Sequence, residues 1–234
     1  MEFVLYIAFI VAMVLALVAQ IRVSTTFNRY ARVATRQGRT AEQVARLMLN
    51  TAGLYDVRIE RTRGHLSDHY DPRTNTLRLS DGVYGNASAA AIGVACHEAG
   101  HAIQHARDYA PVKLRSALVP VTNFASRLWW IIVMLGSLLL GVAGYADGSL
   151  GMILIYVGIG LFSFTTLFQL VTLPCEFDAS ARALRAMRAT GYFESSEIVA
   201  SQRVLRAAAL TYVAATVVSL LQLLRLIMMF RRRN

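Results

Sequence analysis

The sequence predicts a mainly α-helical, multi-pass membrane protein with a small β-hairpin beside a helix that carries an HExxH pattern. Four long apolar runs occur in a chain of 234 residues that is 56% hydrophobic and 16% charged, a balance typical of membrane proteins. The pattern from His97 to His101 lies in an alanine-rich stretch with helical character. Alternating polarity between residues 57 and 80 indicates short strands.

The expected membrane topology accounts for the net charge of +10. A basic patch on a soluble fold would suggest nucleic acid as a partner. Here the basic residues instead crowd one side of the apolar runs, as the positive-inside rule requires. We therefore expect the lipid bilayer as the surroundings and no nucleic-acid partner.

Residues 1–21 are predicted to form the first transmembrane helix. Their apolar run is long enough to cross a bilayer core. A cleaved signal peptide would have basic residues before the run, whereas here Glu2 precedes it and Arg22, Arg29 and Arg32 follow it. We expect this segment to stay attached, with its N-terminus outside.

Residues 22–127 are predicted to form a cytoplasmic region that contains the HExxH helix. Residues 24–53 have apolar positions at helical spacing, with Gly53 as a stop. DVRIERT and NTLRLS alternate in polarity around a turn at 71–75, which predicts the hairpin. Its second strand, residues 75–80, is expected to be an edge on which an extended peptide could pair.

The chemistry of the HExxH pattern indicates a zinc site. On a helix His97 and His101 share one face, and neutral imidazole is a good zinc ligand. Glu98 can meet a water on the same ion. His105 cannot complete the site, because eight residues of helix span about 12 Å while zinc bonds are about 2 Å long. A third ligand must come from another segment, and the alternative is a pair of surface histidines.

The next segment is predicted as a broken connection followed by a transmembrane hairpin. Pro111 and Pro120 interrupt residues 107–127. Residues 128–173 then form the hairpin, whose apolar runs and short loop are 128–144, 150–173 and 145–149. The segments before and after this hairpin must lie on one side of the membrane.

Residues 174–206 are therefore predicted as a second cytoplasmic region. Pro174 should end the third span and begin a new helix, which Gly191 ends. Glu176, in its first turn, lies on the same side as the histidines and could be the third ligand. Asp178 is about 200° further round the helix, so we expect an i,i+4 pair with Arg182 instead.

Residues 207–234 are predicted as a fourth transmembrane helix, with its apolar run at 207–224, and a basic tail at 231–233. Each of the two cysteines, Cys96 and Cys175, immediately precedes a proposed metal ligand. In the cytosol thiols stay reduced. We therefore interpret both as small buried side chains rather than a disulfide.

Several blocks of the chain resemble the YugP-like neutral zinc metallopeptidases of bacterial membranes. They are LSDHYDP, LRLSDGVY, ACHEAGHAIQHARDYAPVKLRSALVPV, LFQLVTLPCEFDASARAL and VLRAAALTYVAA. The resemblance implies a zincin-like catalytic core of the gluzincin type, with one Zn²⁺ per chain. It implies His97, His101 and Glu176 as ligands and Glu98 as the catalytic base. HtpX-like membrane proteases are more loosely similar; they have an Asp four residues after the ligand Glu, where this chain has Ser180.

These observations predict a membrane-bound zinc endopeptidase that hydrolyses peptide bonds through a zinc-activated water. Its substrate would be a peptide or protein, including membrane proteins, and its site would face the cytoplasm. Candidates for a donor to the oxyanion are His65, His69, Tyr70 and Tyr212. The alternatives are a non-catalytic scaffold with a structural zinc site, which has no use for Glu98, and a transporter, for which the spans carry few charges.

Overall fold

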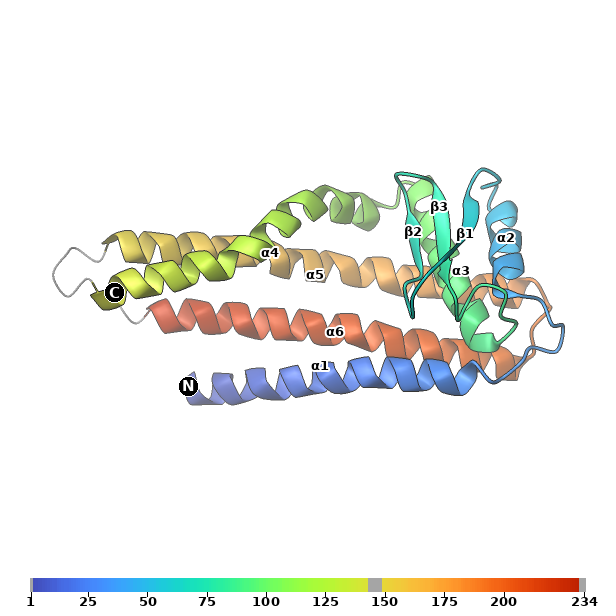
Figure 1. Cartoon of the computed structure of the whole chain (residues 1–234), viewed down its shortest axis with the longest axis horizontal. Coiled ribbons are helices and arrows are strands. Elements are labelled where there is room, and N and C mark those ends of the chain that lie inside the picture. Colours follow the sequence, from blue (N-terminus) through green and yellow to red (C-terminus); the bar gives the residue numbers. More distant parts are fainter. Residues whose placement is uncertain (1, 143–148, 232–234) are drawn as a thin grey trace. The chain divides into compact units, whose positions relative to one another are not determined.

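The computed structural model describes residues 2–142 and 149–231, most of which are helical (Figure 1). The elements in chain order are α1 (Glu2–Tyr30), α2 (Ala41–Thr51), β1 (Arg58–Thr62), β2 (His69–Asp71), β3 (Thr76–Ser80), α3 (Ala89–Ala106), α4 (Ala110–Val142), α5 (Ser149–Ala189) and α6 (Ser195–Arg231). The predicted 145–149 loop, apart from Ser149, and the tail residues 232–234 lie outside the described residues.

The chain divides into two compact units. The helical unit comprises Met1–Leu17, Leu114–Thr172 and Tyr212–Asn234. The sheet unit comprises Val18–Lys113 and Leu173–Thr211. All three strands, together with α2 and α3, belong to the sheet unit.

Four helices of the described chain are long and apolar enough to cross a membrane. They are Phe3–Tyr30, Ala110–Gly141, Ser149–Ala189 and Ser195–Phe230. Because a bilayer core requires about 20 apolar residues in a helix, each of them has sufficient length. The prediction of a mainly helical chain with four candidate membrane-spanning segments is confirmed.

Glycines allow close helix packing within the helical unit. A Cβ on Gly136 would lie 2.7 Å from the carbonyl oxygen of Gly151, and a Cβ on Gly158 would lie 2.4 Å from Val133 Cγ2. Helices in membranes gain little from burying apolar surface, so small residues that permit backbone contact drive their association. Val133 and Ile155 belong to the small buried cluster beside this contact.

Proline does not break the helices where the sequence predicts breaks. Pro111 is the second residue of α4, where its missing N–H has no helical partner anyway. Pro120 and Pro174 lie inside α4 and α5, so the prediction that Pro174 begins a new helix is wrong. One lost hydrogen bond at a proline costs less than the several unpaired backbone groups that a break would leave in apolar surroundings.

The strands form a three-stranded sheet in the order β1-β3-β2. β2, which was not predicted, forms an antiparallel hairpin with β3 around the predicted turn, with Tyr70 opposite Leu77. β1 pairs in parallel on the other side of β3, with Ile59 opposite Leu77. The predicted hairpin between DVRIERT and NTLRLS is therefore wrong, because these segments contain β1 and β3. The prediction that residues 75–80 form an edge is therefore wrong, because β3 is the central strand and its Leu77 and Leu79 are fully buried.

The core of the sheet unit lies around α3. The Ser88 hydroxyl accepts from the Ala91 N–H (3.2 Å) and caps the start of the helix. The small side chains of α3 let neighbouring elements approach, and α2, β2 and β3 all contact it. The amphipathic α2 buries Val44 and Leu49, and Gly53 follows it with φ +81°, as the sequence predicted. These contacts hold the HExxH helix against both the sheet and α2.

Candidate metal centre

Helix α3 presents His97 and His101 on one face. Their ring centroids are 4.8 Å apart and their planes lie at 85°. Each side chain is only 12% exposed. The four-residue spacing produces this arrangement, since it advances a helix by one turn and about 40°. The alternative of two surface histidines is therefore not what the structure shows.

Close approach of α5 to α3 occurs beside these histidines, at Gly100. A Cβ on Gly100 would lie 2.8 Å from the carbonyl oxygen of Ala179 and 3.2 Å from its Cα. Only glycine fits this crossing without a shift of the backbone. Ala179 lies three residues after Glu176, so the crossing directs Glu176 toward α3.

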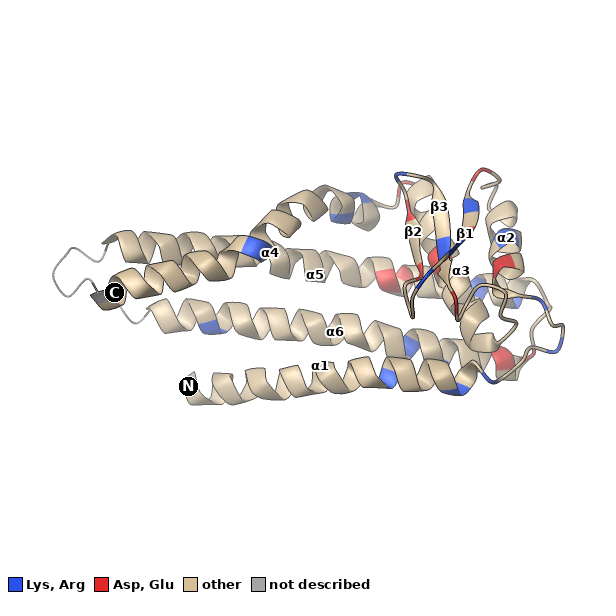
Figure 2. Cartoon of the chain, in the orientation of Figure 1, with Lys and Arg blue, Asp and Glu red and all other residues tan. Residues whose placement is uncertain are grey.

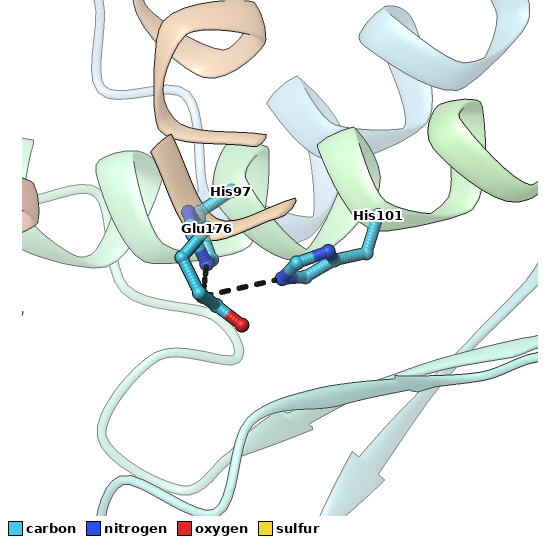
Figure 3. A group of neighbouring side chains, drawn as sticks. All are labelled: His97, His101 and Glu176. Carbon is cyan, nitrogen blue, oxygen red and sulfur yellow. Dashed lines mark hydrogen bonds and ion pairs between the residues drawn. The ribbon is translucent and has the colours of Figure 1, made fainter. Parts of the chain in front are cut away.

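Glu176 completes a group of three converging side chains (Figure 3). Its Oε2 lies 3.2 Å from His97 Nε2 and 3.5 Å from His101 Nε2, and its side chain is 2% exposed. The ligand atoms of the three residues all lie within 4.8 Å of one another. The structure thus brings together the three residues that were predicted as ligands from separate parts of the chain.

The donor set fits a zinc ion. It offers two imidazole nitrogens and one carboxylate oxygen, a combination found at catalytic zinc sites. A carboxylate as buried as that of Glu176 needs a positive partner, which a divalent cation supplies. Three protein ligands would leave a coordination position for water or substrate. The residues present therefore fit an open rather than a closed metal site.

A second layer of hydrogen bonds orients both imidazoles. The Ser180 hydroxyl lies 3.0 Å from His97 Nδ1. Gln104 Oε1 lies 2.9 Å from His101 Nδ1 and accepts a hydrogen bond from it, because Gln104 Nε2 donates to the Cys175 carbonyl (2.8 Å) and to Asp178 (2.9 Å). With Nδ1 protonated, the Nε2 lone pair of His101 faces Glu176 and is free to bind a metal.

Asp178 has two roles, of which the sequence predicted one. Its Oδ2 accepts from Arg182 Nε at 2.5 Å, which confirms the i,i+4 pair. The same oxygen accepts from Gln104, so Asp178 reaches His101 through one intermediate residue. Gln104 was not predicted, although it lies three residues after His101 on the same helix face; Ser180 was noted only as a departure from the HtpX-like pattern.

Glu98 lies on α3 between the two histidines. Burial raises the pKa of its carboxyl, and the negative charges of Glu176 and Asp68 act in the same direction. The charges of His97 and His101 oppose this shift. A carboxylate with a raised pKa is a stronger base than one in water, which suits a group that takes a proton.

The cysteines and the third histidine of α3 lie outside the group of three. Cys96 and Cys175 are both buried, and neither forms a disulfide with a described residue, as predicted. Burial raises the pKa of Cys96 to about 12, so it stays protonated and is a poor metal ligand. The His105 ring stacks at a tilt with Tyr70, with centroids 5.6 Å apart.

The contacts of the four candidates for an oxyanion donor do not single out one of them. The Tyr70 hydroxyl donates to Asn75 Oδ1 (2.8 Å). His69 Nδ1 lies 2.8 Å from the Ser67 carbonyl oxygen, and the His65 ring packs edge-on against Phe27. Tyr212 belongs to the helical unit. These contacts favour none of the four, and the role stays a prediction.

Four candidate membrane-spanning helices and a buried His-His-Glu group suited to zinc give the class of this chain, a membrane protein with a candidate zinc site. The chain belongs to the family described as "Putative neutral zinc metallopeptidase", whose model matches residues 5–231. It is 46% identical over 221 residues to "Putative membrane protease YugP" of Bacillus subtilis (strain 168), with 94% of each chain covered. No solved structure matches the chain. The predicted family resemblance is confirmed.

Proposed function

We propose that the chain is a membrane-bound, zinc-dependent endopeptidase with a zincin-like core. The observation that carries this proposal is the convergence of His97, His101 and Glu176, with Glu98 close enough to interact electrostatically with all three. The descriptions of the family and of the Bacillus relative support it. A structural site would need a fourth protein ligand in place of the open position.

His97, His101 and Glu176 would hold one Zn²⁺ per chain. When bound, zinc supplies Lewis-acid chemistry, because it lowers the pKa of water toward neutrality and polarises a peptide carbonyl. Glu98 takes the proton of the attacking water and later passes it to the leaving amine. Ser180 and Gln104 keep the two imidazoles in orientation through the reaction.

The substrate would be a peptide or protein, membrane proteins included, bound in an extended form. β3 is paired on both sides, whereas β2 is an edge strand that also contacts α3. We therefore place the substrate backbone along β2, where main-chain hydrogen bonds are available. Extended binding at a sheet edge suits an enzyme that acts within a chain rather than at its end.

The site is proposed to face the cytoplasm. Residues 22–127 and 174–206 would form the cytoplasmic regions, between the membrane segments 1–21, 128–173 and 207–224. Of the 24 Lys and Arg residues, 15 lie from Arg22 to Arg127 and 5 from Arg182 to Arg206. The positive-inside rule assigns this basic side to the cytoplasm.

Two variants of the purified full-length protein test the division of roles. Glu98→Gln should retain one zinc per chain, as measured by metal analysis, and lose cleavage of an unfolded protein such as casein. Glu176→Ala should lose the metal as well, because it removes a ligand. A wild type that binds zinc without cleaving substrates would favour the scaffold, and equal metal loss in both variants would contradict the roles.

A further inference from the structure

A cavity of about 630 Å³ lies in the sheet unit between α1 and α6. Each helix contributes one face to it, because the lining positions follow the spacing i, i+3, i+4 and i+7. The lining residues are Arg22, Thr25, Thr26, Arg29 and Tyr30 of α1, and Arg203, Arg206, Ala207 and Leu210 of α6. None of them belongs to the candidate metal centre.

All the charged residues that line this cavity are basic. Its charged residues are four arginines, with no carboxylate among them, and none of the four forms an ion pair with a described residue. Arg203 donates to the Tyr30 hydroxyl at 2.6 Å, and Arg29 lies over the Tyr30 ring at 5.7 Å. Four guanidinium groups in one cavity repel each other and provide donors for an anion, above all a phosphate.

Exposed apolar side chains adjoin the cavity. Along α1 the apolar run ends directly before Arg22, and Figure 2 shows the basic residues of α1 gathered in its C-terminal part. Val18 and Ile21 are 51% and 56% exposed, and Leu210 of α6 is 45% exposed. Along α6 the apolar run begins directly after Arg206. A phosphate-binding surface next to exposed apolar side chains has the two-part chemistry of a phospholipid.

We propose that this cavity binds the headgroup of an anionic phospholipid. The arginines hold the phosphate, and the acyl chains lie along Val18, Ile21 and Leu210. Phosphatidylcholine would bind less well, because its quaternary ammonium group neutralises the phosphate and would face the same arginines. Basic cavities between membrane helices are known to select anionic lipids in this way.

The test uses the full-length protein in phosphatidylcholine nanodiscs with a small fraction of spin-labelled phosphatidylglycerol, whose immobilised fraction reports binding. Arg22→Gln combined with Arg206→Gln should reduce selectivity over labelled phosphatidylcholine by roughly tenfold or more. These two arginines are exposed. The matched control, Arg63→Gln with Arg188→Gln, removes the same charge elsewhere on the sheet unit and should leave selectivity within about twofold.

Equal losses in the two double variants would overturn the proposal, because they would show diffuse attraction of the basic side for anionic lipid. Unchanged selectivity in the Arg22 and Arg206 variant would overturn it as well. Displacement of the labelled lipid by millimolar inorganic phosphate would indicate a site for free phosphate instead. Binding should be the same in metal-stripped protein and in Glu98→Gln, so the result is independent of the proposed catalysis.

Discussion

Individual side chains at the metal centre show how the imidazoles are oriented. Gln104 is fully buried, and its amide NH₂ group donates to the Cys175 carbonyl and to Asp178. Its oxygen must therefore face His101. This arrangement determines which nitrogen of His101 is free for a metal.

We expect Gln104→Ala to weaken zinc binding by about 10–100-fold, the usual effect of losing a hydrogen-bond partner of a metal-bound histidine. Competition with a chelator of known affinity would measure it. Gln43→Ala is the matched control, because Gln43 Oε1 accepts from the Thr40 N–H at the start of α2, outside the group of three. A Gln104 variant that binds zinc like the wild type would contradict the orienting role.

Residues of the site differed in how well the sequence predicted them. His97 and His101 could be found from spacing alone, because a helix puts positions i and i+4 on one face. Glu176 needed the membrane topology and the family resemblance, since it is distant in sequence. Gln104 could not be predicted, because its role depends on Asp178 and on the Cys175 carbonyl of another helix.

Among the elements, the crossing of α3 and α5 makes the metal centre possible. We expect Gly100→Ala to destabilise the fold by about 1–3 kcal/mol, as overpacking does, and to weaken zinc binding because it pushes Glu176 away from the histidines. Thermal unfolding and chelator competition would measure the two effects. Gly160→Ala is the control: a Cβ there has no neighbour within 4 Å, so it should be neutral or slightly stabilising. Equal effects in both would contradict the crossing argument.

The turn between β2 and β3 depends on an ionised carboxylate. The hydrogen bond from Thr74, with those from Arg78 and the Arg73 N–H, lowers the pKa of Asp71 to about 2, below its ordinary value of 3.8. A carboxyl group whose pKa is lower in the folded than in the unfolded state stabilises the fold at pH values above its unfolded-state pKa. This stabilisation is lost as the pH falls through the folded-state pKa.

Asp71→Asn should therefore lower the melting temperature at pH 7, with a difference from wild type that narrows as the pH falls from about 4 to about 2. Thermal unfolding at a series of pH values would show it. Asp56→Asn, which removes an exposed carboxylate, should change little at any of them. If the difference in melting temperature between Asp71→Asn and the wild type did not depend on pH, the negative charge of Asp71 would play no part in stability.

Elements that depend on local pattern were predicted better than those that depend on distant pairing. The turn at residues 71–75 carries its signal in its own residues. The parallel pairing of β1 with β3 does not, since a strand pattern contains no information about its partner. The continuity of α5 through Pro174 likewise depends on apolar surroundings that outweigh a local helix-breaking signal.

At the scale of the whole molecule, hydrophobic runs predicted the four long helices because length and polarity suffice to recognise a candidate span. The division into a helical unit and a sheet unit follows contacts between residues far apart in the chain. Basic residues concentrate in the parts of the sequence that form the sheet unit, which is the ground for placing the site in the cytoplasm.

Labelling of single cysteines tests this topology. Cys96 and Cys175 are first replaced by alanine, and single cysteines are introduced at Asn75, Ser149 and Asn234, one per variant. Asn75 lies in the turn before β3, on the side proposed to be cytoplasmic, and Ser149 lies at the start of α5, on the side proposed to be external. With an impermeant thiol reagent on intact cells, the cysteine at 149 should therefore be labelled and the one at 75 protected. Labelling at 75 would place the site on the exterior.

The cysteine at 234 tests whether residues 207–224 cross the membrane fully, which 18 mostly apolar residues allow. A full crossing requires labelling at 234, although the positive-inside rule favours the cytoplasm for the three arginines before it. Protection at 234 would show that residues 207–224 do not cross.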